Sequence, residues 1–181
     1  MRYDRNEIIS RFNSKGAKFL LFWGHTPSGG AVGKECLSQW YDCLFEIEGV
    51  RYRTAEQYMM SQKALLFGDR EINERIMKAP DPKAFKQLGK KVRGFDDNMW
   101  KKERCNIVVR GNYAKFSQNE PLKEFLLGTG ENILVEASPY DKIWGIGLSA
   151  NNKKAENPNL WKGLNLLGCC LMEVRDMLRE G

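Results

Sequence analysis

The sequence predicts a mostly helical α+β fold with a small β component, arranged as one compact domain over residues 1–181. Three observations support this prediction. Amphipathic segments with helix start and stop signals fill the chain between residues 54 and 127. The candidate strands are few and short. A length of 181 residues, with 42% hydrophobic and 29% charged residues, is typical of a single globular domain.

The N-terminal part is predicted to hold a short helix over residues 4–12, a buried strand over 17–23, and a hairpin over 43–48 and 50–53. Residues 24–35 resemble a phosphate-binding loop at first sight. However, Ser28 stands at the first glycine position and Glu35 replaces the magnesium-binding hydroxyl residue, so we reject that motif.

The central helix is predicted from Thr54 to Gly68. Thr54, with Gln57 three residues later, is a capping box, and Gly68 supplies the stop. The helix combines charges and large apolar residues on one face, because a period of 3.6 residues aligns Glu56, Met60, Lys63 and Phe67. Two interpretations stay open, a solvated face with a snorkelling lysine and a functional site.

Helices are predicted next at 70–78, 82–92, 98–116 and 122–127, followed by a strand at 133–137. A final helix opens within 161–168 and runs to about residue 179. Gly145, Gly147 and Ala150 match the dinucleotide fingerprint by accident, because residues 151–158 cannot form the required helix. Asp141 and Trp144 lie on this glycine-rich loop, where polar residues can point into a cleft.

The composition excludes several classes of site. His25 is the one histidine, and the five cysteines contain no CxxC pair, so neither a zinc site nor a disulfide framework is predicted. Acid and base chemistry should therefore fall mainly to Asp, Glu, Lys, Tyr or Cys. No segment has the pattern of a membrane span or a signal peptide, so we expect a cytoplasmic protein without a membrane partner.

The positive charge is concentrated in one block. Residues 83–104 hold eight lysine or arginine residues and three acidic ones, a local charge of +5 in a chain whose net charge is +6. Such a block suits nucleic acid or a phosphate-bearing ligand, and it equally fits the solvated face of one or two helices.

The chain resembles the NADAR family, also called YbiA-like. The resemblance covers nearly the whole chain and rests on the order and spacing of these motifs: Tyr52-Arg53-Thr54-Ala55-Glu56-Gln57-Tyr58, Lys63-Ala64, Trp100, Lys115-Phe116, Leu134-Val135-Glu136, Asp141-x-x-Trp144-Gly145-x-Gly147 and Trp161-x-Gly163-x-Asn165-x-Leu167-Gly168. One departure is Ser38-Gln39-Trp40, where YbiA-like bacterial enzymes carry a Ser-Asn-Phe type of stretch.

The resemblance implies an N-glycosidase that cleaves between a phosphorylated ribose and an exocyclic amino group, without a metal or other cofactor. Some family members remove ADP-ribose from guanine in DNA, among them antitoxin partners of DarT-type toxins. Others cleave ribosylamino-pyrimidine intermediates of riboflavin synthesis. We favour ADP-ribosylated guanine in DNA, because of the basic block and the Ser-Gln-Trp departure, and a DarT-like toxin partner is a possible consequence.

By the same resemblance, Glu56 and Asp141 are the candidate catalytic acids. Because an amine leaving group lets the sugar ring open to an imine, Lys63, on one helix face with Glu56, is a candidate Schiff-base nucleophile. That role requires a neutral Lys63, with a pKa lowered by apolar neighbours such as Met60 and Phe67. The candidate substrate-binding residues are Trp23, Ser38, Trp40, Arg53, Trp100, Trp144, Gly145 and Asn165. Two alternatives of another class stay open, a non-catalytic module that binds ADP-ribose or NAD-derived ligands, and, with less support, a sequence-specific nucleic-acid binder.

Overall fold

The computed structural model describes residues 1–27 and 29–181, and of Lys15 only the backbone. It contains two compact units. One is Gln39–Asn119; the other combines Met1–Ser38 with Glu120–Gly181. Helices dominate both, and the predicted mostly helical α+β fold is confirmed. The single domain over residues 1–181 stays a prediction.

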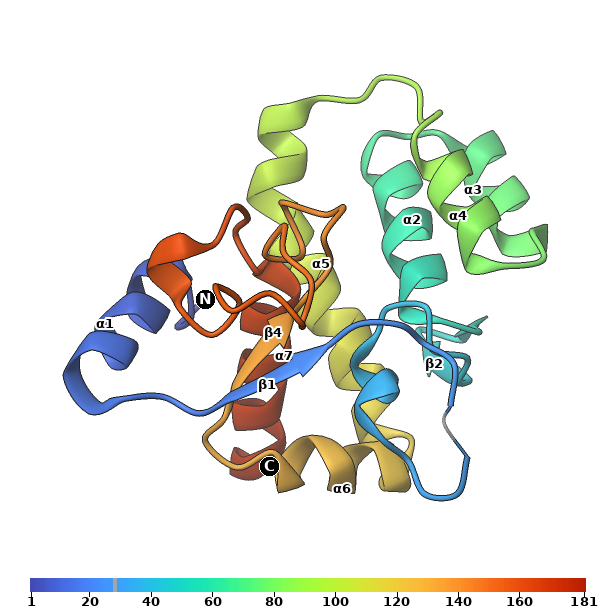
Figure 1. Cartoon of the computed structure of the whole chain (residues 1–181). Coiled ribbons are helices and arrows are strands. Elements are labelled where there is room, and N and C mark those ends of the chain that lie inside the picture. The colour runs from blue at the N-terminus through green and yellow to red at the C-terminus, as the bar shows by residue number, and fades with distance from the viewer. Residues whose placement is uncertain (28) are drawn as a thin grey trace. The chain divides into compact units, whose positions relative to one another are not determined.

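The unit Gln39–Asn119 is built around helix α2 (Ala55–Leu66), which packs against α3 (Arg70–Lys78), α4 (Pro82–Gly89) and α5 (Asp97–Ser117) (Figure 1). The predicted hairpin precedes it as β2 (Phe45–Ile47) and β3 (Val50–Tyr52), an antiparallel pair in which Phe45 faces Tyr52.

Helix α2 begins as the capping box predicts. The hydroxyl of Thr54 accepts a hydrogen bond from the backbone N–H of Gln57 at 3.1 Å. The side-chain oxygen of Gln57 reaches back and accepts from the backbone N–H of Arg53 at 2.8 Å. The start of the helix is therefore fixed by local side chains before tertiary packing is considered.

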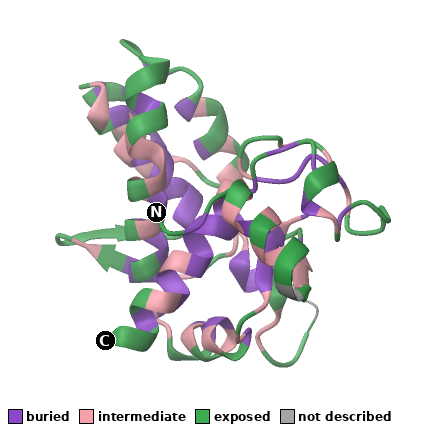
Figure 2. Ribbon diagram, turned by 90° about the vertical axis from the view of Figure 1, so that its left-hand side faces the viewer, coloured by how far each residue is buried: buried purple, intermediate pink, exposed green. Residues whose placement is uncertain are grey.

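Aromatic and small residues bury α2. The ring of Tyr58 meets that of Tyr52 edge to face at 5.0 Å and contacts Phe45. A side chain at Gly111 of α5 would collide with this ring, so the glycine permits the two helices to approach closely. Buried and exposed residues lie side by side on the same helices in Figure 2, as amphipathic packing requires.

The second unit holds α1 (Arg5–Lys15), β1 (Phe19–Phe22), the 3₁₀ turn η1 (Lys34–Leu37), α6 (Glu120–Gly128), β4 (Ile133–Glu136), the 3₁₀ turn η2 (Pro158–Leu160) and α7 (Leu166–Glu180). Strands β1 and β4 pair in parallel, with Phe19 opposite Ile133, and α7 runs along β4 (Figure 1).

Several boundaries differ from the prediction. Helix α4 ends at Gly89 instead of residue 92, and the last helix begins at Leu166. Asn165 explains the late start, because it takes a left-handed conformation with φ of 56°, which a helix cannot contain. The turns η1 and η2 and the parallel pairing of β1 with β4 were not predicted.

Asn165 also joins α7 to strand β4. Its side-chain amide donates to the carbonyl of Leu134 at 2.9 Å, and its side-chain oxygen accepts from the backbone N–H of Glu136 at 2.9 Å.

No helix among the described residues is long and apolar enough to cross a membrane.

We predict that Gly168→Ala destabilises the protein by about 1–3 kcal/mol or more, since a Cβ at this position would overlap the carbonyl oxygen of Leu134 and the amide of Asn165. Thermal and urea unfolding measure the effect. Gly128→Ala is the matched control, because nothing lies within 4 Å of the added methyl group and alanine favours the helix. Equal unfolding midpoints for the Gly168→Ala variant and the native protein would contradict the packing described.

Candidate active site

Glu56 lies in the first turn of α2 and is buried, with 4% of its surface exposed. Its backbone N–H donates to the carbonyl of Gln39 at 2.9 Å, so the stretch before the hairpin is tied to the helix start. The positive end of the helix dipole stabilises a negative charge at this position. A buried carboxylate in a helix N-terminus is therefore not the solvated acid of the first interpretation.

Lys63 lies two turns further along α2 and is half-buried. Its Nζ donates to the carbonyl of Gly89 at 2.8 Å. Two aromatic rings border the amine: the ring of Phe95 is centred 4.3 Å from Nζ, and that of Trp100 is centred 5.5 Å away. The amine is therefore bordered by two aromatic rings and one backbone carbonyl.

Burial lowers the pKa of Lys63 below its usual value, because the ammonium form loses hydration. The sequence predicted apolar neighbours for this amine and named Met60 and Phe67. The structure gives it Phe95 and Trp100 instead, while Phe67 holds Phe95 in place edge to face at 5.2 Å. Met60 contacts Gly89, the residue whose carbonyl accepts from Lys63.

Other candidate residues of this unit lie nearer the surface. Arg53 is exposed, donates to the carbonyl of Pro80 at 3.2 Å, and pairs with Asp42 at 3.5 Å. Trp40 is half-buried and follows Gln39, whose carbonyl accepts from Glu56. Arg53 thus directly precedes Thr54, the residue that caps α2, and Trp40 adjoins a residue bonded to the first turn of that helix.

The remaining candidates belong to the other unit. Asp141 folds its loop by accepting backbone hydrogen bonds on Oδ1 from Ile143 and Trp144, each at 2.8 Å. Gly145 is buried, and a Cβ there would lie 2.8 Å from the carbonyl oxygen of Glu136. Its own carbonyl accepts from the backbone N–H of Asn165 at 3.2 Å. The structure thus places Asp141, Trp144 and Gly145 on one loop and joins this loop to Asn165, the residue before α7.

The candidate residues of this unit differ in burial and in hydrogen bonding. The amide of the fully buried Asn165 is bonded to strand β4, which gives it a positioning part. Trp144 is half-buried. Trp23 is 56% exposed, and the centre of its ring lies 6.2 Å from that of Tyr140. Ser38 follows the turn η1 and donates its backbone N–H to the carbonyl of Glu35.

Sequence reasoning missed several residues around α2. Phe95 and Gly89 border Lys63, and Asn112 bonds to the side chain of Gln39 at 2.8 Å. Lys115 is fully buried, with its amine 5.6 Å from the centre of the Tyr41 ring. Only Lys115 carried a signal, since it belongs to a family motif; the others become neighbours through helix packing.

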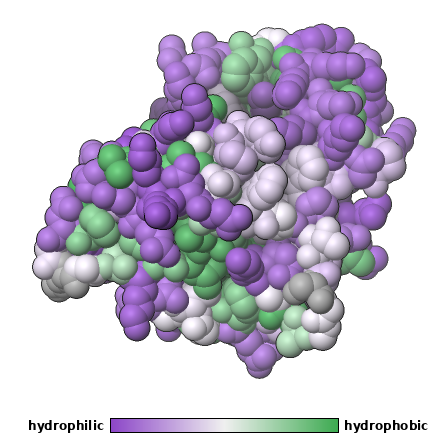
Figure 3. Space-filling view, viewed as in Figure 1, coloured by the Kyte–Doolittle hydropathy of each residue, from purple (hydrophilic) through white to green (hydrophobic). Residues whose placement is uncertain are grey.

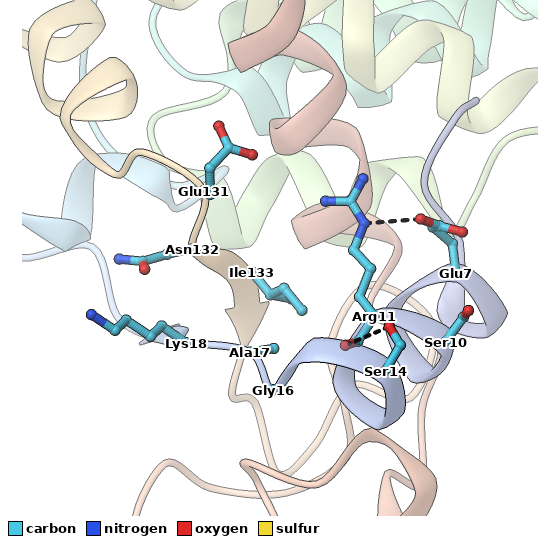
Figure 4. Close-up of a pocket in the computed structure, with 10 residues that line it drawn as sticks. All are labelled: Glu7, Ser10, Arg11, Ser14, Gly16, Ala17, Lys18, Glu131, Asn132 and Ile133. Atoms are coloured by element: carbon cyan, nitrogen blue, oxygen red, sulfur yellow. Dashed lines mark hydrogen bonds and ion pairs between the residues drawn. The ribbon is translucent and has the colours of Figure 1, made fainter.

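A polar hollow of about 630 Å³ lies beside α1 (Figure 4). Its charged groups include Arg11, which is paired with Glu7 at 2.9 Å, and Glu131. None of the candidate residues predicted from the sequence lines it. Among the described residues, no group of three or more His, Cys, Asp or Glu side chains could hold a metal ion.

A family model described as the NADAR domain matches residues 21–179. The chain belongs to the NADAR domain family. The resemblance inferred from the sequence motifs is thereby confirmed, and the NADAR match spans α2 as well as the Asp141 loop.

Three relatives of this NADAR chain are informative. An N-glycosidase of Acanthamoeba polyphaga mimivirus is 43% identical over 164 residues, which are 88% of this chain and 95% of the relative. Protein irg-1 of Caenorhabditis elegans is 40% identical over 177 residues, and the match covers 97% of this chain and 82% of irg-1. A riboflavin biosynthesis protein of Vibrio vulnificus is 30% identical over 80% of this chain but only 35% of its own length.

The NADAR fold is also seen in a solved structure. The NMR structure of the Escherichia coli protein YbiA matches with a TM-score of 0.69 at 23% identity, covering 90% of this chain and 86% of that one. At this identity the match supports the fold alone.

We predict that the amine of Lys63 reacts at lower pH than an ordinary lysine, because its lowered pKa leaves more neutral amine at any pH below the usual value. Competitive acylation across a pH series, read by peptide mass spectrometry, gives the pH of half-maximal labelling. A model lysine peptide in the same tube is the reference. A midpoint for Lys63 at or above that of the peptide would contradict the effect of burial.

Proposed function

We propose that the protein removes ADP-ribose from guanine bases of DNA by cleaving the bond between the ribose and the exocyclic amino group. The observation that carries the proposal is that one face of α2 holds a buried carboxylate and, two turns further on, a lysine amine bordered by two aromatic rings. The coarser activity is established through the family: the chain is a hydrolase that acts on N-glycosyl compounds, like its mimiviral relative.

Two chemical routes use these groups. In the first, the carboxylate of Glu56 takes a proton from water, the water oxygen bonds to the anomeric carbon, and the bond to the exocyclic nitrogen breaks as that nitrogen is protonated. Neither route requires a metal.

In the second route, the sugar ring opens to an imine, and the neutral amine of Lys63 adds to its carbon. The exocyclic amine of guanine leaves with a proton, and a lysine Schiff base remains. Water then hydrolyses that imine, which frees the aldehyde form of ADP-ribose and restores the amine. The lowered pKa of Lys63 favours this route, because only the neutral amine is a nucleophile.

Exposed lysines that lie near the neighbours of Lys63 in the sequence favour a nucleic-acid substrate. Lys90 and Lys91 directly follow Gly89, the hydrogen-bond partner of Lys63, and Lys102 lies two residues after Trp100. All three lysines are exposed. Figure 3 shows mainly hydrophilic residues over the neighbouring helices α3 and α4. We call Lys90, Lys91 and Lys102 the lysine rim; it can bind the phosphates of a DNA strand whose modified base reaches Lys63 and its two aromatic neighbours.

Part of the basic block is unavailable for this purpose. Arg93 is engaged by the buried carboxylate of Asp69 at 2.6 Å and by Glu71 at 2.9 Å, and Lys101 pairs with Asp97. The contacts of Arg93 hold the loop between α4 and α5, whereas the Lys101 pair lies within α5. Arg93 and Lys101 are thus engaged within the protein, whereas the lysine rim is exposed.

Hydrolysis of ribosylamino-pyrimidine intermediates is the second candidate function, favoured by the riboflavin biosynthesis relative. A non-catalytic module that binds ADP-ribose is the third. Such a binding module would make no use of the lowered pKa of the Lys63 amine. A toxin partner of the DarT type stays an expectation from the sequence.

We predict that the native protein releases ADP-ribose from an oligonucleotide that carries ADP-ribosyl-guanine, and that Glu56→Gln lowers kcat by about 10²–10⁴-fold, the usual contribution of a general base. Chromatography of the released ADP-ribose measures the rate, and a ribosylamino-pyrimidine phosphate is assayed alongside. Glu74→Gln, an exposed change on α3, is the control. Turnover of the pyrimidine alone would replace the proposed substrate, and turnover of neither would favour the binding module.

Borohydride separates the two routes. We expect reduction with borohydride during turnover to fix a ribose adduct on Lys63, which peptide mass spectrometry detects. The Lys63→Met variant should form no adduct and have no activity, although it unfolds at the same temperature as the native protein. A folded, fully active Lys63→Met protein would eliminate the Schiff base and leave the Glu56 route.

We predict that neutralising the lysine rim (Lys90→Gln, Lys91→Gln, Lys102→Gln) raises KM for the oligonucleotide but not for ADP-ribosyl-guanosine. Each lost phosphate contact should also reduce the slope of log affinity against log salt by about 0.7–0.9. The control variant neutralises three exposed lysines elsewhere, Lys34, Lys153 and Lys154. Equal KM and salt slope in both variants would show that the rim does not bind DNA.

A further inference from the structure

Gln39 and Asn112 form a buried amide pair at the start of α2. Gln39 is 7% exposed and Asn112 is fully buried. The Nδ2 of Asn112 donates to the side-chain oxygen of Gln39 at 2.8 Å and to the carbonyl of Val108 at 2.9 Å. The backbone carbonyl of Gln39 accepts from the N–H of Glu56, so the pair is linked to the candidate catalytic acid.

The orientation of both amides is fixed by Val108. Exchanging the oxygen and nitrogen of Asn112 would bring two oxygens together at the carbonyl of Val108, so Nδ2 must face it. The same Nδ2 requires an acceptor on Gln39, and this places Oε1 toward Asn112. The remaining atoms are therefore a donor, Gln39 Nε2, and an acceptor, Asn112 Oδ1.

Neither remaining atom has a hydrogen-bond partner among the described residues, although both are buried. Unsatisfied buried polar groups are costly and rare, and they call for an explanation. Each belongs to one of the two amides that this hydrogen bond joins. One hydroxyl oxygen could satisfy both, because an O–H accepts one hydrogen bond while donating another.

We propose that Gln39 and Asn112 form a specificity site for a single hydroxyl group beside Glu56, which accepts from Gln39 Nε2 and donates to Asn112 Oδ1. The hydroxyl comes from the ribose of the substrate or from the attacking water. This inference rests on the proposed N-glycosidase function. It assigns roles to two residues, Gln39 and Asn112, that do not themselves supply acid, base or nucleophile.

Gln39→Glu is the decisive variant, because it preserves the acceptor for Asn112 and the side-chain length while replacing the Nε2 donor with an oxygen. Gln39→Met, of similar length, removes both polar atoms. Asn106→Asp, an exposed amide-to-acid change on α5, is the control for added negative charge. Thermal unfolding of each variant establishes that it is folded.

We expect Gln39→Glu to lower kcat/KM for the better of the two substrates by about 10–100-fold, the scale of one lost buried hydrogen bond. A ribose hydroxyl would appear as a raised KM, and as loss of the native preference for ribose over the 2′-deoxy or 3′-deoxy substrate. Water would appear as a lowered kcat with KM and that preference unchanged. Native kinetics in both folded Gln39 variants would overturn the site.

The inference can fail separately from the proposed function. If the native protein turns over neither substrate, the function fails, and stabilisation by ADP-ribose then tests the site. A thermal shift with ADP-ribose that Gln39→Glu reduces, and Asn106→Asp does not, supports a ribose hydroxyl. An equal shift in all three proteins, or no shift in any, overturns the site.

Discussion

The burial of α2 is the constraint on which the unit Gln39–Asn119 depends. Eight of its twelve residues are buried, and they include a carboxylate, an amide and a hydroxyl that each need an electrostatic or hydrogen-bonding environment. The capping box satisfies the amide of Gln57, and Ser61 donates to Asn73 at 2.7 Å. Neighbouring helices therefore supply specific polar partners as well as apolar surface. A helix held in this way can keep an acid and an amine at fixed places along one face.

The other unit solves a different problem, the start of a helix against a strand. Asn165 accepts left-handed backbone geometry, which costs free energy, and its amide gains two hydrogen bonds to β4 that repay the strain. The same residue bonds to the carbonyl of Gly145, so the Asp141 loop is fixed by the residue that fixes α7. The loop and the helix are therefore coupled. A substitution at Asn165 should displace Trp144 even when no ligand is bound.

Local signals predicted the elements well, because caps and periodicity are written into neighbouring residues: α3 appears at the predicted residues, and α2 starts at its capping box. The candidate acids and Lys63 came from family motifs, and their roles stay predictions. The neighbours that surround those residues in space could not be predicted from local sequence signals. Phe95 follows Lys63 by more than thirty residues, and Asn112 follows Gln39 by more than seventy, so their contacts depend on tertiary packing. The early end of α4 at Gly89 was missed for the same reason, since that residue faces Met60 and Lys63.

Opposing effects act on the amine of Lys63, and their balance bears on its chemistry. The carbonyl of Gly89, the two aromatic rings and the negative end of the α2 dipole all favour the ammonium form. Loss of hydration disfavours it, and the pKa falls. Desolvation can outweigh the other effects because a dipole contributes only about 0.3–1 kcal/mol near a surface. An amine in this balance can be neutral as a nucleophile, and the positive charge of the iminium that it then forms meets the same carbonyl and rings. The carbonyl of Gly89 and the two rings thus offset part of the desolvation cost that this positive charge carries.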